Sequence, residues 1–315
     1  MVDWPQLLAF AAARPGEPLA LATLVGRRGS SYLAPGARLL IAADASHVGA
    51  LSAGCLESRL AASARAIVLG APARLLEIDT LPHYGCPGVL EVFIEPLPTA
   101  LLPALGAALA SRTPFTLVTR LVGPAAGTSL APSGSDLSPT RGQPHVFHHS
   151  VAPQPRLIVI GGEGDAAALA SFASTLGWLH IPCPPDVPAA HLLSHYPPDA
   201  RTALVLLTHK FTHDLRLLRA LLPAGYPYLG LLGSRRRRES LLAELGADGL
   251  LADDTALAAL HAPVGLDLGS ETPAAVALSI VAEIQAVWSG TSGAPLRARL
   301  GPLHSRSPLP AEAHP

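Results

Sequence analysis

The sequence predicts an α/β protein with two domains. The first combines helices with a mixed or antiparallel sheet, and the second is built on a doubly wound parallel sheet. Length is one observation behind this prediction, because 315 residues suffice for two separate hydrophobic cores. A second is the alternation of apolar strands with helical segments after residue 156, which is typical of βαβ units. A third is the period-two pattern of residues 89–95, which indicates a half-buried strand.

Composition excludes several classes of protein. Hydrophobic residues make up 49% of the chain and charged residues 14%, which is typical of a compact soluble protein rather than a disordered one. The net charge is −1, and apart from the four consecutive arginines at 235–238, no basic block indicates a nucleic-acid partner. Apolar runs are interrupted before 18 residues, and the N-terminus lacks the pattern of a signal peptide, so we expect no membrane span and a cytoplasmic location. Three cysteines, an odd number, do not indicate a disulfide framework.

Residues 1–123 form the predicted first domain. In chain order we expect a helix at 3–13, a strand at 19–25, a loop at 26–31, strands at 39–43 and 48–51, a helix at 57–69, strands at 74–78 and 89–95, a helix at 101–110 and a strand at 115–122. Residues 124–155 are dense in Gly, Pro, Ser and Thr. They are predicted to be a linker, with a short strand near 145–147.

Residues 156–290 form the predicted second domain. In chain order we expect a strand at 156–160, a glycine loop, a helix at 166–176, a strand near 179–183, a strand at 203–208, a helix at 213–222, a strand at 228–233, a helix at 236–245 and a last apolar helix at 273–288. Residues 291–315 are rich in Pro, Ser and Gly, and they are predicted to be a flexible tail.

The turn Ser52–Glu57 places Cys55 where a strand leads into a helix. Unpaired backbone N–H groups and the helix dipole at such a position favour the thiolate form. The helix that follows has no Gly or Pro. The alternative is that Cys55 only fills the core, because free cysteines are among the most often buried residues.

A second cysteine, Cys86, lies in the glycine turn Gly85–Gly88 ahead of a strand. The loop with Ser30 and Ser31 is small and carries hydroxyl groups. The cysteine spacing matches no zinc motif, whereas soft thiolates suit molybdenum, copper(I) or sulfur transfer. Cys183 lies in a proline-rich strand and receives no role.

The glycine loop after residue 160 fits the pattern G-x-G-x-x-A between a strand and a helix, which predicts a Rossmann-like domain. Candidate binding residues here are Gly161, Gly162 and Gly164. Two acidic residues, Glu163 and Asp165, would oppose a pyrophosphate at this helix N-terminus. The end of the next strand, where an acidic residue would bind the ribose, is rich in proline, and Asp186 is the one candidate for this ligand. NAD or NADP binding therefore stays open beside a nucleotide-binding fold without a competent site.

Two further candidates end neighbouring strands of this domain. His209 follows one strand, on the rim where ligands bind in such folds, and Asp214 is expected to serve the first turn of the next helix. Arg235 follows the cap candidate Ser234 and is a candidate anion ligand. Residues 236–238, also arginines, are predicted to form a solvated helix face.

With these motifs in order, the chain resembles the XdhC/CoxI family of maturation factors for molybdenum hydroxylases such as xanthine dehydrogenase. The resemblance covers residues 19–288 and rests on the order and spacing of motifs that are each weak alone. The motifs are Gly29-Ser30-Ser31, Ser52–Glu57, Gly85–Gly88, Ile94–Leu97, Gly161–Ala166, Leu176–Trp178, Thr208–His209, Tyr228–Arg235, Pro263–Pro273 and Ser279–Ile284.

The resemblance implies a protein that binds molybdenum cofactor (molybdopterin) transiently, protects it, presents it to a cysteine desulfurase for sulfuration and delivers it to the hydroxylase. It implies a homodimer without turnover of its own. By position, Cys55 is the residue near the molybdenum and Cys86 the second candidate. Gly54, Ser30 and Ser31 complete the site, and Glu57 either stabilises its helix or reaches the pterin.

The chain departs from the family pattern in the glycine loop, where Glu163 aligns with the second glycine, and at Pro184, which falls where the family tends to place the strand-end acid. Two other functions remain alternatives. One is an NAD(P)-dependent oxidoreductase that uses the second domain, and the other is an assembly scaffold without a small ligand.

Overall fold

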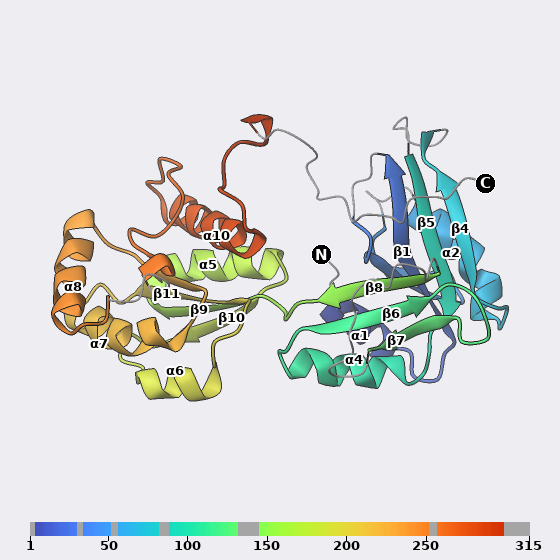
Figure 1. Ribbon diagram of the computed structural model, residues 1–315, viewed down its shortest axis with the longest axis horizontal. Coiled ribbons are helices and arrows are strands. Elements are labelled where there is room, and N and C mark those ends of the chain that lie inside the picture. The colour runs from blue at the N-terminus through green and yellow to red at the C-terminus, as the bar shows by residue number, and fades with distance from the viewer. Residues whose placement is uncertain are drawn as a thin grey trace. The chain divides into compact units, whose positions relative to one another are not determined.

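The computed structural model describes residues 4–29, 34–51, 56–81, 88–131, 145–251 and 257–298. They belong to two compact units, the first extending to Val151 and the second beginning at Ala152 (Figure 1). Each unit has its own sheets and its own buried core, as expected for two domains.

The first unit is built on a five-stranded antiparallel sheet. Its strands lie in the order β3-β2-β1-β5-β4, and each pairing is antiparallel. Antiparallel pairing therefore holds where the sequence left a mixed sheet open. The strands are β1 (Leu19–Gly29), β2 (Arg38–Ala42), β3 (His47–Gly49), β4 (Arg74–Asp79) and β5 (Gly88–Pro96).

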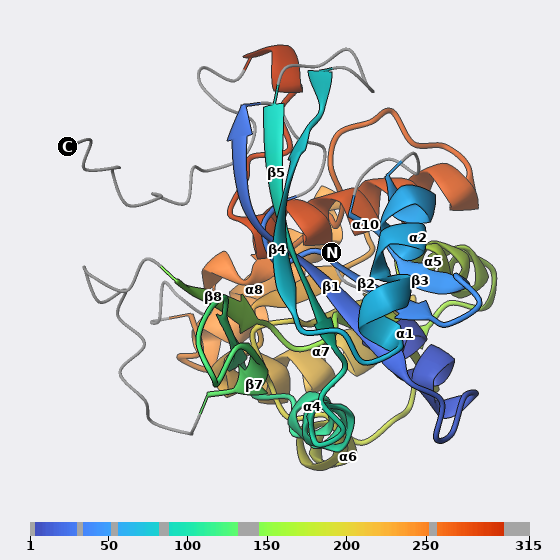
Figure 2. The ribbon, with the colours of Figure 1, turned by 90° about the vertical axis from the view of Figure 1, so that its right-hand side faces the viewer.

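Two layers cover this sheet. Helix α2 (Glu57–Val68) packs through its apolar stripe on one face, with Leu60, Ala64 and Ile67 buried. The other face packs against α1 (Trp4–Ala12), α4 (Leu101–Ala110) and a second sheet. Figure 2 shows α2 on one side of the large sheet and β7 and β8 on the other.

The second sheet of this unit corrects the predicted linker. β6 (Phe115–Arg120) lies between β7 (Gly127–Leu130) and β8 (Val146–Val151), antiparallel to both. Segment 124–155 was expected to be a linker because of its composition, but these strands complete the core of the first unit. The strand predicted near 145–147 is the beginning of β8.

Strand β1 also differs from its prediction. It continues to Gly29 through residues expected to form a loop, because Gly26–Gly29 pair with β5 after a register shift at Val25. Glycines and arginines give this segment the composition of a loop, whereas its backbone hydrogen-bonding partner lies far along the chain.

The second unit has a parallel sheet with helices on both faces, which confirms the predicted fold class. Its order is β10-β9-β11-β12-β13. The strands are β9 (Arg156–Gly161), β10 (Leu179–Cys183), β11 (Thr202–Leu207), β12 (Tyr228–Leu231) and β13 (Leu260–His261). Helices α5 (Glu163–Thr175) and α10 (Pro273–Ser289) cover one face; α6 (Ala189–His195), α7 (Phe211–Leu221) and α8 (Arg235–Ala247) cover the other.

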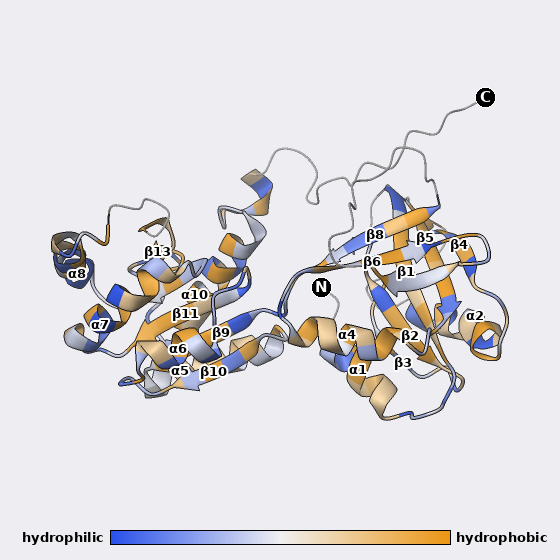
Figure 3. Cartoon of the chain, turned by 60° about the horizontal axis from the view of Figure 1, so that its bottom comes forward, coloured by the Kyte–Doolittle hydropathy of each residue, from blue (hydrophilic) through white to orange (hydrophobic). Residues whose placement is uncertain are grey.

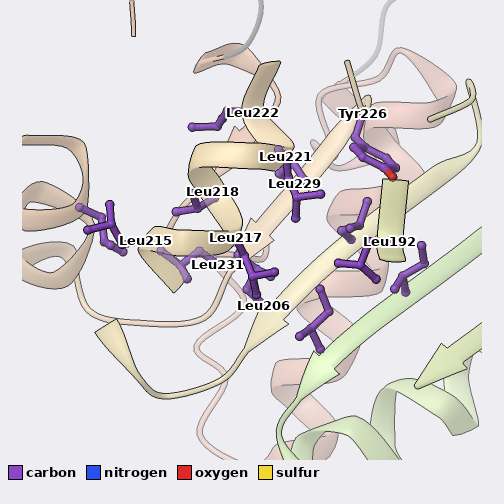
Figure 4. Close-up of a cluster of buried hydrophobic side chains, with 14 of the residues drawn as sticks. Leu192, Leu206, Leu215, Leu217, Leu218, Leu221, Leu222, Tyr226, Leu229 and Leu231 are labelled. Carbon is purple, nitrogen blue, oxygen red and sulfur yellow. The ribbon is translucent and has the colours of Figure 1, made fainter. Parts of the chain in front are cut away.

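Alternate residues of each central strand enter opposite cores, as the strand period requires. Ile158 and Leu206 pack beneath α6, α7 and α8, whereas Val159 and Val205 pack beneath α5 and α10. Figure 4 shows the first of these cores, in which leucines of α7 meet β11 and β12. In Figure 3 β11 carries the hydrophobic colour, whereas much of α8 carries the hydrophilic colour.

Two elements of this unit were not expected. Helix α6 follows a proline-rich stretch and begins after Pro188, which has extended backbone, and β13 is two residues long. Helix α5 begins at Glu163 rather than at Ala166, directly after Gly162. Short 3-10 turns lie at Leu222–Ala224 and Leu296–Ala298.

The strand order locates the place where such sheets bind ligands. β9 lies between β10 and β11, so the chain reverses its direction across the sheet between β9 and β11. In doubly wound folds, ligands bind outside the carboxyl ends of the strands at this reversal. The residues at this position are Gly161, the last residue of β9, with Gly162 after it, and Thr208 and His209 after β11.

Candidate functional site

The flanks of two predicted site loops meet at one end of the antiparallel sheet, and β3 leads to the flank of a third. β1 ends at Gly29, which pairs with Gly88, the first residue of β5. The loop with Ser30 and Ser31 and the loop with Cys86 therefore leave from the same strand pair. β3 runs parallel in direction to β1 and leads to Leu51, before the turn with Gly54 and Cys55. Ser30, Ser31, Gly54, Cys55 and Cys86 themselves lie outside the described residues.

Glu57 anchors the turn that carries Cys55. Its Oε1 accepts a hydrogen bond from the backbone N–H of Leu51 at 2.8 Å, and its Oε2 accepts one from the N–H of Leu56 at 3.2 Å. Glu57 is buried with 5% relative exposure, and both leucines are fully buried. One carboxylate thus holds the backbone on both sides of residues 52–55. The sequence had left open whether Glu57 stabilises its helix or contacts the pterin.

Thr80 anchors the loop that carries Cys86. Its backbone N–H and its side-chain Oγ1 both donate to the carbonyl of Gly88, at 2.8 and 2.9 Å. The N–H of Leu81 donates to Oδ1 of Asp79 at 2.9 Å. Hydrogen bonds between Thr80 and Gly88 therefore join the residues on the two sides of segment 82–87. Sequence reasoning missed Thr80, because its partner is recognised only once β4 and β5 are paired.

A buried polar cluster that the sequence did not reveal joins the two sheets of the first unit. Nη1 of Arg38 donates to the carbonyl of Gly36 at 2.9 Å and to Nδ1 of His149 at 2.7 Å. Burial lowers the pKa of Arg38 to about 9. Burial, together with the neighbouring guanidinium, lowers the pKa of His149 to about 4, so this imidazole is neutral near pH 7.

The same cluster includes an acid. Glu95 is 1% exposed and accepts hydrogen bonds from the N–H of Thr128 at 2.7 Å and from its hydroxyl at 2.5 Å. Burial raises the pKa of Glu95, against the opposing effect of these bonds and of Arg38. These contacts tie β5 to β7, and hence the large sheet to the segment that was expected to be a linker.

In the second unit, the structure brings Gly161, Gly162 and His209 to the same edge. The two glycines have φ values of +81° and +70°. A Cβ on Gly162 would lie 2.5 Å from Cβ of Leu207, and one on Gly161 would lie 3.0 Å from the carbonyl oxygen of Leu207. His209 is exposed and has a φ of +56°, which is uncommon for a residue with a side chain.

A network beneath His209 involves a residue of the arginine run. Asp214 is 1% exposed, and its Oδ1 accepts from the hydroxyl of Thr208 at 2.5 Å. Its Oδ2 accepts from Nε of Arg237 at 3.1 Å and from Nη2 at 2.5 Å, while Nη1 of Arg237 donates to the carbonyl of His209 at 3.4 Å. Arg237 was predicted to lie on a solvated face. Instead it is half-buried, because the beginning of α8 packs beside that of α7.

The remaining site residues of this unit are placed separately. Arg235 opens α8 and is exposed, next to Ser234, whose hydroxyl accepts from the N–H of Arg237 at 3.2 Å. Gly164 lies in the first turn of α5, and a Cβ there would have nothing within 4 Å. Asp186 is exposed in a turn beyond the end of β10. Burial raises the pKa of the Cys183 thiol.

A pocket of ≈ 500 Å³ was not foreseen from the sequence. It lies between Leu232, which follows β12, segment 264–271 and the residues Val276 and Ser279 of α10.

Within the described part of the chain, no group of three or more His, Cys, Asp or Glu residues is arranged to hold a metal ion. Among the helices described, none combines the length and apolar character needed to cross a membrane.

Comparisons with known proteins agree in both units. The model of the XdhC and CoxI family matches residues 12–79, and the model of the XdhC Rossmann domain matches residues 157–284. A protein of Bacillus subtilis, named as a probable xanthine dehydrogenase subunit, is 26% identical over 85% of this chain and 92% of its own length. "Molybdenum cofactor insertion chaperone PaoD" of Escherichia coli is 28% identical over 90% of this chain and 89% of its own length.

A solved structure agrees as well. The crystal structure of a protein described as a xanthine dehydrogenase from Bacillus halodurans superposes with a TM-score of 0.75 at 25% identity, covering 92% of this chain and 96% of that one. The two family models together span more than half of the chain, one in each unit. The chain therefore belongs to the XdhC and CoxI family.

Proposed function

We propose that this protein is a molybdenum-cofactor chaperone that binds the cofactor, protects it and delivers it to a xanthine dehydrogenase-type hydroxylase, without turnover of its own. The observation that carries the proposal is that hydrogen bonds of Glu57 and Thr80 hold the residues that flank the two cysteine segments of the first unit. The names of two relatives, one an insertion chaperone and the other a probable component of xanthine dehydrogenase, support it.

The chemistry of the available thiols fits this cargo. When bound, the cofactor supplies a molybdenum centre, for which soft thiolates are suitable ligands. By its position in the family pattern, Cys55 is the proposed ligand and Cys86 the second. Burial raises the pKa of the Cys183 thiol, which makes it a poor thiolate. Gly54, Ser30 and Ser31 are proposed to shape the surroundings. Sulfuration by a cysteine desulfurase, a homodimer and a cytoplasmic location belong to the same proposal.

Anaerobic purification tests this function directly. The wild type, Cys55→Ala and the matched control Cys183→Ala would be produced in cells that make the cofactor, and molybdenum and pterin would be measured in each. We expect both in the wild type and the control, and loss of both in Cys55→Ala. Equal cofactor in all three proteins would rule out the role of Cys55, and an empty wild type would contradict the chaperone function.

One observation favours a second candidate, an oxidoreductase that binds NAD(P). Gly161, Gly162 and His209 meet at the strand reversal where doubly wound folds bind ligands, and Arg235 begins the helix after the next strand. Against it, α5 begins with Glu163, so acidic residues occupy the turn that would face a pyrophosphate. Calorimetry with millimolar NAD or NADP tests this candidate, which requires a binding heat that a His209→Ala variant reduces.

A further inference from the structure

A buried arginine between the two sheets of the first unit keeps two of its donors unpaired. The side chain of Arg38 in β2 is 1% exposed, and burial lowers its pKa to about 9, so it is still a cation near pH 7. Its Nη1 donates to Gly36 and to His149. Nε and Nη2, which share one edge of the planar guanidinium, have no hydrogen-bond partner among the described residues.

The second unit shows what a buried guanidinium normally requires. Arg156 in β9 is 5% exposed, and its Nε donates to the hydroxyl of Thr202 at 3.0 Å. Its Nη2 donates to the carbonyl of Pro197 at 2.8 Å and to Asp199 at 3.3 Å. The two nitrogens that are unpaired in Arg38 are therefore satisfied in Arg156. Because buried polar groups are almost always hydrogen-bonded, the free edge of Arg38 calls for a partner.

The polar residues beside Arg38 do not supply this partner. Glu95 is a nearby acid, but its carboxylate accepts from the N–H and the hydroxyl of Thr128 and makes no ion pair with Arg38 in the described part of the chain. Thr23 lies directly opposite Arg38 on β1 and is fully buried, and its hydroxyl has no described partner either. Opposite residues of an antiparallel pair share a face, so unpaired groups of both residues lie on one side of the sheet.

Arg38 also lines a cavity of ≈ 10 Å³. The rest of its described wall consists of Trp4 and of leucines, which come from α1, α4 and the strands of both sheets and from Leu97 after β5. Cζ of Arg38 lies 5.1 Å from the centre of the Trp4 ring. The volume is close to the least that holds one water-sized particle. The cavity thus combines an apolar wall, room for a single small particle and one buried cation.

We propose that this cavity binds one monatomic anion, chloride being the common example, on the Nε–Nη2 edge of Arg38. No side chain of the described wall accepts a hydrogen bond, because arginine and the indole of Trp4 only donate. A water molecule needs two to four polar partners, and its own O–H groups would face leucines here. An anion needs donors alone and compensates the buried charge. Sulfate, phosphate and carboxylates have several heavy atoms and exceed the volume.

The first test compares chloride with a larger anion. In a Trp178→Phe, Trp288→Phe background, the fluorescence of Trp4 follows the unfolding of the first unit while sodium chloride replaces sodium gluconate at constant ionic strength. At ten times its dissociation constant, chloride should raise the melting temperature by about 3–6 °C, and the rise should saturate.

Two variants connect this rise to Arg38. Arg38→Met should lose it, whereas the matched control Arg65→Met, whose arginine is exposed on α2, should keep it. Equal responses of the two variants, or a melting temperature that does not rise with chloride in the background chain, would overturn the proposal.

The second test needs no substitution, so it holds even if Arg38→Met does not fold. Crystals of the full chain are grown with sodium bromide, because bromide is a monatomic anion whose anomalous scattering distinguishes it from water. We expect an anomalous peak in the cavity, within hydrogen-bonding distance of Nε and Nη2 of Arg38. Peaks at exposed positions alone, which would indicate an adventitious ion only, or the absence of a peak at Arg38 would overturn the proposal.

Discussion

Replacing Asp214 by Asn tests the buried ion pair that joins α7 to α8 in the second unit. The substitution keeps the size of the side chain and one acceptor for Thr208, but turns an NH₂ group toward Nε and Nη2 of Arg237. Breaking a buried pair on one side costs about 3–5 kcal/mol. Because the Arg237 side chain retains 22% exposure, water partly compensates it, and we expect the lower end, about 3 kcal/mol. For a unit of this size, this corresponds to a fall in melting temperature of roughly 6–12 °C.

The assay must report on the second unit alone, because two units do not unfold as one two-state system. Trp178 and Trp288 form an edge-to-face pair with ring centroids 4.7 Å apart in this unit. In a Trp4→Phe background their fluorescence follows its unfolding. The matched control is Asp248→Asn, whose pair with Arg219 joins the same two helices at 2.7 Å but is exposed.

The control Asp248→Asn is expected to lower the free energy of unfolding by at most about 1 kcal/mol, as is usual for a surface ion pair. In a double-mutant cycle, Asp214→Asn with Arg237→Met should cost less than the sum of the single variants, because no charge is then left unpaired. We expect a coupling energy of about 1–3 kcal/mol. If Asp214→Asn melts within the error of Asp248→Asn, the reasoning from burial is refuted.

Two further predictions concern pH and the glycine loop. The pKa of His149 is lowered to about 4 in the fold from an ordinary 6.5, so the unfolded chain binds its proton more tightly, and stability falls as pH drops from 6.5 to 4. Acid denaturation should show a shallower slope in this window for His149→Gln, which still accepts from Arg38 but does not titrate; parallel curves would contradict this. Gly162→Ala should lower the free energy of unfolding by about 1–3 kcal/mol, because the φ of Gly162 is +70° and a Cβ there would clash with Leu207. Gly164→Ala should leave it unchanged or raise it by up to about 1 kcal/mol. Equal melting temperatures for the two alanine variants would contradict that account.

The sequence predicted the elements whose signals are local. Strands β9 and β11 are continuous apolar runs, and helix α2 has an apolar stripe without Gly or Pro, so both types were placed to within a few residues. β7 was not predicted, and β8 was predicted only as a short strand near 145–147, because the stability of both comes from pairing with β6. The extension of β1 to Gly29 was not predicted for the same reason, since its partner β5 is distant in the chain.

The positions of the described candidate residues along strands and helices could be predicted better than their contacts. The turn Ser52–Glu57 and the positions of Gly161, Gly162 and His209 follow from strand ends and helix starts. Hydrogen bonds between distant residues do not, and so the sequence could not show that the carboxylate of Glu57 accepts from the N–H of Leu51 and of Leu56. It also could not single out Arg237 among four consecutive arginines, because only the packing of α8 beside α7 brings one of them to Asp214.

The glycine loop shows why a motif alone did not decide between a dinucleotide site and a fold without one. Gly161 and Gly162 are required by the approach of the β9–α5 turn to Leu207, whatever binds there, so their presence carries no information about a pyrophosphate. Gly164, which has open space around it, is the position where a ligand rather than packing would demand glycine. A discriminating residue is then Asp165 in the first turn of α5, whose charge opposes the attraction of that helix end for anions. Gly161 and Gly162 thus serve the packing of the second unit whether or not a nucleotide binds there.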